Sequence, residues 1–301
     1  MKCKHIFSFL IFLMGNTFLF AQLSDAQKKE LDEKAKGFDF YFNCGTYLPN
    51  KFTANFYNGT SSSVDANRVF SNSQLKRHID ELIASRQNII MDASGVSLGE
   101  LPTNMRYNLS FIFGFGCLYH LNRNLSLSLS FSQARINTVS GFTLTYNSGV
   151  SGNERPQILE YTIVGKELRN FFELGVTYQF YAHEYVFPFV EFATQLNNVK
   201  VKNADLVIED NSFTMIDYYG GQMYDPSIDQ TRIDPYLGGV GGGVLVGAGA
   251  RIPFMKHIAL EPLVQCQYTF VNLAIDGQKR FLPSFNFMIR LIVGDRIFTN
   301  T

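Results

Sequence analysis

The feature that most constrains this chain is a strict alternation of apolar and small polar residues. In Leu125–Ser132, large apolar residues alternate with serines, and in Met105–His120 a mostly aromatic set alternates with a mostly small or polar set. Because successive side chains point to opposite faces only in a β-strand, each segment predicts a strand with one apolar and one polar face. The residues between them, 121–124, predict a tight turn and therefore a hairpin.

The same period of two recurs along the chain and predicts a series of eight strands. They are expected at Phe38–Leu48, Met105–His120, Leu125–Ser132, Phe172–Phe180, Val186–Leu196, Tyr236–Ile252, Ile258–Phe270 and Pro283–Val293. The connections alternate in length: short at 121–124, 182–185 and 253–257, and long at 49–104, 139–170, 199–234 and 271–282. Short turns at one rim and long loops at the other are typical of transmembrane barrels, with the short turns in the periplasm.

A soluble β-sandwich or a lipocalin-like barrel would also alternate, but its outer face would carry Lys and Glu. Here the polar faces are mostly Ser, Gly, Gln and Asn, only 17% of the residues are charged, and the chain holds 29 Phe and 15 Tyr. Such a polar face suits a crowded barrel interior, and a closed barrel satisfies every backbone group in lipid. We therefore predict an all-β membrane protein, an eight-stranded antiparallel up-and-down transmembrane β-barrel with long extracellular loops.

The N-terminus predicts export. Lys2, Lys4 and His5 precede an apolar run, Ile6–Phe20, and a small residue, Ala21. This is the pattern of a secretory signal peptide; the alternative, a membrane anchor, needs a longer uninterrupted run. We expect a signal peptide at 1–21, a short periplasmic segment at 22–36, and a barrel at 37–301 in the bacterial outer membrane.

Charge and cysteine content argue against a nucleic-acid partner, a disulfide framework and a zinc site. Without Lys2 and Lys4, the 26 basic residues fall to 24 against 26 acidic residues, so nothing indicates nucleic-acid binding. The three cysteines beyond the predicted signal peptide are odd in number and lack C-x-x-C spacing, and they predict neither a disulfide framework nor a zinc site.

Charged residues at inward positions predict a lumenal charge network. Its expected members are Asp39, Arg106, Glu173, Glu191, Arg251, Glu261 and Arg290. Burying one of these charges without a partner would lower the stability of the fold by roughly several kcal/mol, so the acids and bases should pair across the lumen. A gated pore or proton path is one interpretation; the favoured one is a structural plug that fixes the register of the barrel, because the interior at this size is filled by side chains.

The first long loop, 49–104, predicts a helix over Ser73–Met91. Its apolar face would consist of Leu75, Ile79, Leu82, Ile83 and Ile90. Long loops with their own helix are often functional. The face could cover the barrel mouth or contact a partner protein, and the sequence leaves both open.

No catalytic, cofactor-binding or metal-binding residues are predicted. His120, His183 and His257 lie beside the short turns, on the periplasmic side. Only His78 is expected on the extracellular side, and the sequence indicates no Ser or Asp beside it that would form a catalytic Ser–His arrangement. The glycines of 238–249 lie within a strand and do not form a G-x-G-x-x-G loop.

A signal peptide ending in Phe-Ala-Gln, eight aromatic-rich strands and a final strand, Phe285–Val293, near the C-terminus resemble the small outer-membrane β-barrel proteins of Bacteroidota. These are grouped with OmpA-like or PorT-like barrel domains. The tail after that strand departs from the family pattern of a terminal aromatic, for which Phe298 could substitute.

The leading functional hypothesis is a non-enzymatic outer-membrane barrel whose extracellular loops bind a partner or ligand, as a subunit of a larger secretion or assembly complex. The expected partners are outer-membrane lipid and other outer-membrane proteins. The alternative is a transporter or narrow channel for small or hydrophobic molecules. A lipid-modifying enzyme ranks below both.

Overall fold

The computed structural model describes residues 36–149, 155–180, 186–218, 237–255, 257–273 and 280–294. The predicted signal peptide and all but the last residue of the segment after it lie outside these ranges, as does the predicted turn at 182–185. In the described part of the chain no helix is long and apolar enough to cross a membrane.

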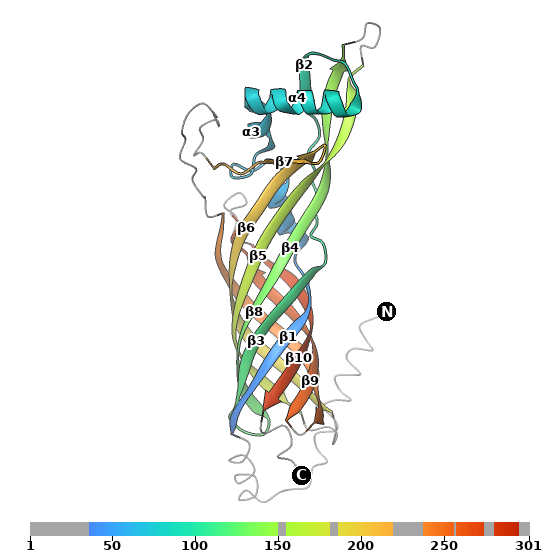
Figure 1. Ribbon diagram of the computed structural model, residues 1–301. Coiled ribbons are helices and arrows are strands. Elements are labelled where there is room, and N and C mark those ends of the chain that lie inside the picture. Colours follow the sequence, from blue (N-terminus) through green and yellow to red (C-terminus); the bar gives the residue numbers. More distant parts are fainter. Residues whose placement is uncertain are drawn as a thin grey trace, which may run out of the picture.

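Eight antiparallel strands close into a barrel, which confirms the predicted fold class (Figure 1). They are β1 (Gly37–Leu48), β3 (Ser110–His120), β4 (Leu125–Ser148), β5 (Gln157–Gln179), β6 (Phe187–Ile208), β8 (Gly238–Met255), β9 (Ile258–Phe270) and β10 (Phe281–Gly294). Each strand pairs with the next of this series, and β1 pairs with β10, so the ring closes between the first and last strands.

The outer wall of the barrel is an apolar belt. Phe40, Phe115 and Leu174 are 64%, 62% and 61% exposed, whereas the residues that alternate with them face inward and are mostly buried. An exposed apolar surface of this extent is stable only against another apolar medium. The protein is therefore a transmembrane barrel, with the belt in contact with lipid.

Three strands continue far beyond the belt, which corrects two of the predicted loops. β4, β5 and β6 have 24, 23 and 22 residues, so much of 139–170 and the start of 199–234 is strand. Outward residues there turn polar, as at Arg135 and Asn137, and the aromatic alternation that marks the belt ends. In Figure 1 these strands rise past the rim of the barrel as a separate extension.

A compact head is built on this extension, on the side away from the short turns (Figure 1). We define the head as the described residues of 49–109, 136–165 and 199–218. It contains η2 (Lys51–Tyr57), α3 (Ala66–Ser71), α4 (Ser73–Gln87), β2 (Met91–Leu98), which pairs with β4, and β7 (Asn211–Thr214), which pairs with β6. Its core includes Phe56, Val96, Phe142, Leu144, Ile163, Leu206 and Met215.

The predicted helix is present as α4, but its apolar face is already occupied. Ile79 and Ile83 are fully buried in the head core, and Leu75 and Leu82 pack against it. Ile90 lies beyond the end of the helix and is 68% exposed. The buried part of the face proposed as a partner contact is thus covered by this chain, within one cluster that also holds residues of β2, β7 and the upper parts of β4, β5 and β6. Asn72 begins the helix, since its side chain accepts hydrogen bonds from the Gln74 and Leu75 amides.

Candidate functional site

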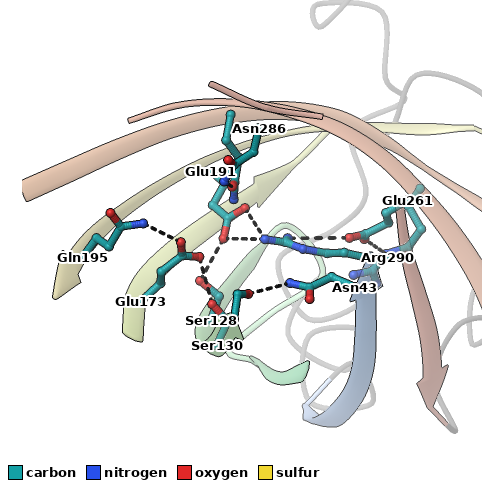
Figure 2. A network of polar contacts seen from close by, with 12 residues as sticks. Asn43, Ser128, Ser130, Glu173, Glu191, Gln195, Glu261, Asn286 and Arg290 are labelled. Carbon is teal, nitrogen blue, oxygen red and sulfur yellow. Dashed lines mark hydrogen bonds and ion pairs between the residues drawn. The ribbon is translucent and has the colours of Figure 1, made fainter. Parts of the chain in front are cut away.

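The barrel interior holds a buried ion pair at its centre. Arg290 on β10 donates from Nη2 to both carboxylate oxygens of Glu191 on β6, at 3.1 and 2.8 Å. Its Nη1 lies 3.9 Å from Glu261 Oε2, and its guanidinium stacks 4.8 Å from the ring centroid of Tyr41. Figure 2 shows Arg290 between the two carboxylates. Charge-assisted hydrogen bonds of this kind hold a buried pair in one geometry.

Glu173 lies beside this pair and is held by neutral groups. It accepts hydrogen bonds from Ser130 Oγ at 2.9 Å and from Gln195 Nε2 at 2.8 Å (Figure 2). Among the described residues, no basic side chain lies within ion-pair distance of Glu173. Two serines of β4 thus act as hydrogen-bond donors to lumenal carboxylates, Ser130 to Glu173 and Ser128 to Glu191 at 3.3 Å.

A second cluster closes the end with the short turns. Arg251 Nε donates to Glu261 Oε1 at 2.6 Å, and Arg251 Nη1 lies 3.6 Å from Asp39 Oδ2. His120 Nε2 is 2.8 Å from the same oxygen of Asp39, and His120 Nδ1 is 2.7 Å from Ser126 Oγ. Asp39 thus links the histidine to the ion pairs.

The Ser126–His120–Asp39 series has the order of a nucleophile, a base and an acid. Its side chains belong to residues that are only 6%, 8% and 1% exposed and that are packed inside the barrel wall. The two hydrogen bonds connect three strands, since Ser126 belongs to β4, His120 to β3 and Asp39 to β1. Within the described part of the chain, no group of three or more His, Cys, Asp or Glu side chains is placed to hold a metal ion.

A third cluster fills the mouth beneath the head. Arg169 on β5 donates to Glu167 from Nε at 2.7 Å and from Nη2 at 2.5 Å. It also donates to the Tyr47 hydroxyl at 3.0 Å, and to Thr53 Oγ1 and the Tyr107 hydroxyl at 3.2 Å each. Thr53 belongs to η2, so this short helix is fastened to the barrel wall. The cavity bounded by Tyr47, Asn50, Thr53 and Arg169 has room for about one water molecule.

Tyr57 completes the mouth cluster from above. Its hydroxyl donates to Glu167 Oε2 at 2.7 Å, opposite the oxygen that binds Arg169. Burial, and then the negative charge of Glu167, raise the pKa of the Tyr57 phenol well above its usual range. Glu167 is therefore shared between the barrel wall and the head, and it joins the two structurally.

The structure places six of the seven predicted lumenal residues inside the barrel. Asp39, Glu173, Glu191, Arg251, Glu261 and Arg290 are buried and contact one another or their neighbours as described above. Arg106 does not belong to this network. It is exposed and lies before β3, which begins at Ser110 rather than at Met105.

Sequence reasoning missed Arg169 and Glu167, because the fourth strand was expected to begin at Phe172. The inward alternation of Phe171 and Glu173 continues upward through both residues. Extending that period of two by two steps would have found them. An apolar cluster, including Tyr47, Ile112, Phe171, Phe189 and Met288, fills the lumen between the polar groups.

Comparisons with known proteins add the following. No family model matches the chain, and no curated protein sequence matches it significantly. Among solved structures, Neisserial surface protein A is 8% identical, with a TM-score of 0.38, and the match covers 85% of this chain and 96% of that one. The N-terminal barrel domain of Pseudomonas aeruginosa OprF is 11% identical with a TM-score of 0.34, and the match covers 85% of this chain and 98% of that one. OprG from P. aeruginosa is 10% identical with a TM-score of 0.34, and the match covers 86% of this chain and 94% of that one.

The matched part of OprF is a β-barrel domain, and OprG is an outer membrane protein. Because every TM-score is below 0.5, nothing about function follows from the similarities. The protein belongs to the class of eight-stranded transmembrane β-barrels, because its own eight strands close into a ring with a polar, packed interior and an apolar exterior.

Proposed function

We propose that this chain is a non-enzymatic integral protein of the bacterial outer membrane that displays its head outside the cell and acts by binding a partner or ligand there. The observation that carries the proposal is the closure of the lumen. Arg290 and Glu191 span it at the centre, and Arg169 with Glu167 fills the mouth. A barrel closed in this way serves as an anchor rather than as a path for solutes.

The orientation follows from the connections. The residues between β3 and β4, 121–124, form a short turn at the end opposite the head. In outer-membrane barrels short turns face the periplasm and long connections face outward. The head would then be extracellular, and a signal peptide at 1–21 would supply the export that this location requires.

The head is suited to recognition because it is a folded unit on three continuous strands. Its core is closed by Ile79 and Ile83, so the surface left for a partner is the polar face of α4, with Glu81 and Ser85 exposed. Functional loops are typically carried on a rigid scaffold. The sequence resemblance to PorT-like barrels of Bacteroidota favours a partner within a larger outer-membrane secretion or assembly complex.

Conductance in planar bilayers tests the closed lumen. We expect the purified, folded protein to give no stepwise current under conditions in which a large porin conducts. Reproducible, ion-selective steps from the wild-type protein would overturn the proposal and favour the transporter alternative. Heat-modifiable gel mobility of the same preparation shows that the barrel is folded and that silence is not due to loss of structure.

Site-specific photocrosslinking in native membranes tests the binding role. A photoreactive residue at Glu81, on the polar face of α4, should give a crosslink to a discrete protein or surface ligand. The matched position is Phe42, which is 52% exposed on the lipid-facing belt and should give none. Crosslinks absent at Glu81 and at Ser85, in a protein that folds and reaches the surface, would contradict the proposed role of this face.

A further inference from the structure

The outer wall below the head carries a basic patch above the apolar belt, with one row of amide side chains between them on β4, β5 and β6. On β4, β5 and β6, residues at the same level pair across the strands and form outward-facing rows. The top row of the belt is Phe131, Phe172 and Leu196, and the next row up is Gln133, Asn170 and Asn198. The row above that is Arg135, Leu168 and Lys200.

The basic character continues one step higher. Lys166 pairs with Asn137 and Asn203, and Lys202 lies at the neighbouring strand irregularity on β6. Arg106, which sequence analysis placed in the lumen, is exposed next to Tyr107, whose backbone bridges Thr138 on β4. The patch therefore has five basic side chains: Arg106, Arg135, Lys166, Lys200 and Lys202.

Acidic groups are absent from these rows in the part of the chain that the structure describes. Glu167 points inward and is 2% exposed, and the next outward acid is Asp205, which lies above the patch and accepts a hydrogen bond from Asn203 at 3.0 Å. Neither Arg135 nor Lys166 forms an ion pair with any described residue. Two exposed cations without counterions at the edge of an apolar belt favour an anionic ligand.

The belt below the patch offers a surface for acyl chains. Phe115, Phe131 and Phe172 form a continuous aromatic row, with ring centroids 5.6 and 4.9 Å apart. A strand rises about 3.3 Å per residue, so Arg135 lies on the order of 13 Å from Phe131 along the strand, and less than that in height because barrel strands are tilted. Long basic side chains can also extend along the wall toward the interface. Apolar surface below and positive charge above match one molecule with acyl chains and phosphate groups.

We propose that this face binds a phosphorylated lipid of the outer leaflet, with its phosphate on Arg135 and Lys166 and its acyl chains on the Phe115–Phe131–Phe172 row. The inference rests on the proposed outer-membrane location, since only that orientation places the patch at the outer leaflet. Arginine suits this role because its planar guanidinium can donate two hydrogen bonds to one phosphate. Bound lipid would fix the depth and tilt of the barrel beneath the head.

The test is native mass spectrometry of the full, folded protein in detergent, with bis-phosphorylated lipid A and its dephosphorylated form as probes. We expect the phosphorylated form to bind more tightly. Each basic group at a membrane surface contributes about a fivefold change in affinity, so Arg135→Ser with Lys166→Ser should weaken binding roughly 25-fold. The matched control is Arg77→Ser with Arg86→Ser, which removes the same charge from the exposed face of α4.

Equal binding of the two lipid forms, or equal loss in the test and control variants, would overturn the proposal. Displacement of lipid A by an equimolar amount of inorganic phosphate would show a free-anion site and would also overturn it. Heat-modifiable mobility is measured in parallel: a wild-type protein that fails this test contradicts the barrel anchor itself, which separates the two failures. If the double variant does not fold, Arg135→Gln and Lys166→Gln are measured singly.

Discussion

Arg290 Nη2 lies 2.8 Å from Glu191 Oε2, and the two residues belong to strands that are not neighbours in the barrel. β9 and β8 separate β10 from β6 in the sheet, so this pair crosses the lumen rather than linking adjacent strands. Both residues are almost fully buried, at 0% and 2% exposure. Their contact therefore fixes the distance between opposite walls as well as filling the interior.

Replacing Arg290 by Met should destabilise the barrel strongly. Glu191 would remain buried without its cation, a loss that costs about 3–5 kcal/mol. The free energy of unfolding in detergent micelles, from urea titration followed by gel mobility, should fall by this amount. The double variant Arg290→Met with Glu191→Met should recover most of it, and a double variant as unstable as the single one would show that the pair is not the cause.

The head core can be tested at two isoleucines that the sequence placed on one helix face. Ile83→Ala creates a cavity in the head core and should lower the stability of the head by about 2–5 kcal/mol. Limited proteolysis should then cut the head while a barrel fragment persists. Ile90→Ala removes the same atoms from an exposed position and should leave the pattern unchanged; equal cleavage in both variants would contradict the burial described here.

Two strand glycines provide a matched pair for close packing. A Cβ at Gly165 would lie 2.4 Å from the Tyr57 ring, whereas the nearest atom to one at Gly141 is 3.8 Å away. Gly165→Ala should displace Tyr57 from Glu167 and lower the free energy of unfolding by about 1–3 kcal/mol. Gly141→Ala should be neutral or stabilising by up to about 1 kcal/mol. Similar effects at both positions would mean that Tyr57 does not pack against β5.

The stability of the head should fall at alkaline pH through Tyr57. Its pKa is raised in the folded protein, so above about pH 10 the unfolded chain loses the phenolic proton while the folded chain keeps it. The unfolded state then binds fewer protons, and stability decreases as pH rises. Melting temperatures between about pH 8 and 11 should show this decline. Tyr57→Phe should lower stability at neutral pH and flatten the decline, and an unchanged slope would assign the effect to another group.

The strands of the belt were predictable because lipid outside and a packed lumen inside impose opposite chemistry on alternate residues. Leu125–Ser132 shows this pattern without interruption, and it is the lower part of β4. Above the belt the alternation of β4 changes sides: Phe142 and Leu144 point into the head core, whereas the apolar residues of the belt point outward, so the belt pattern does not continue through residues 139–148. The same change hid the upper part of β5, and with it Arg169.

Local signals also identified α4 but not its role. The amphipathic spacing of Ile79 and Ile83 predicts that this face of the helix packs against another apolar surface, but it does not identify that surface. In the structure both isoleucines lie in one buried cluster that combines the neighbouring β2 with the upper parts of β4, β5 and β6, which are far away in the sequence. Arg106 was misplaced for a related reason, since alternation continues for several residues before β3 begins.

The sequence by itself determined the period of two, the number of barrel strands and which face of each strand meets lipid, because these depend only on local alternation. Only the tertiary structure decided which charges meet, because Arg290 and Glu191 are brought together by closure of the ring between β1 and β10. It also decided that the long connections build a head with its own core. That outcome depends on packing between segments that no local pattern relates.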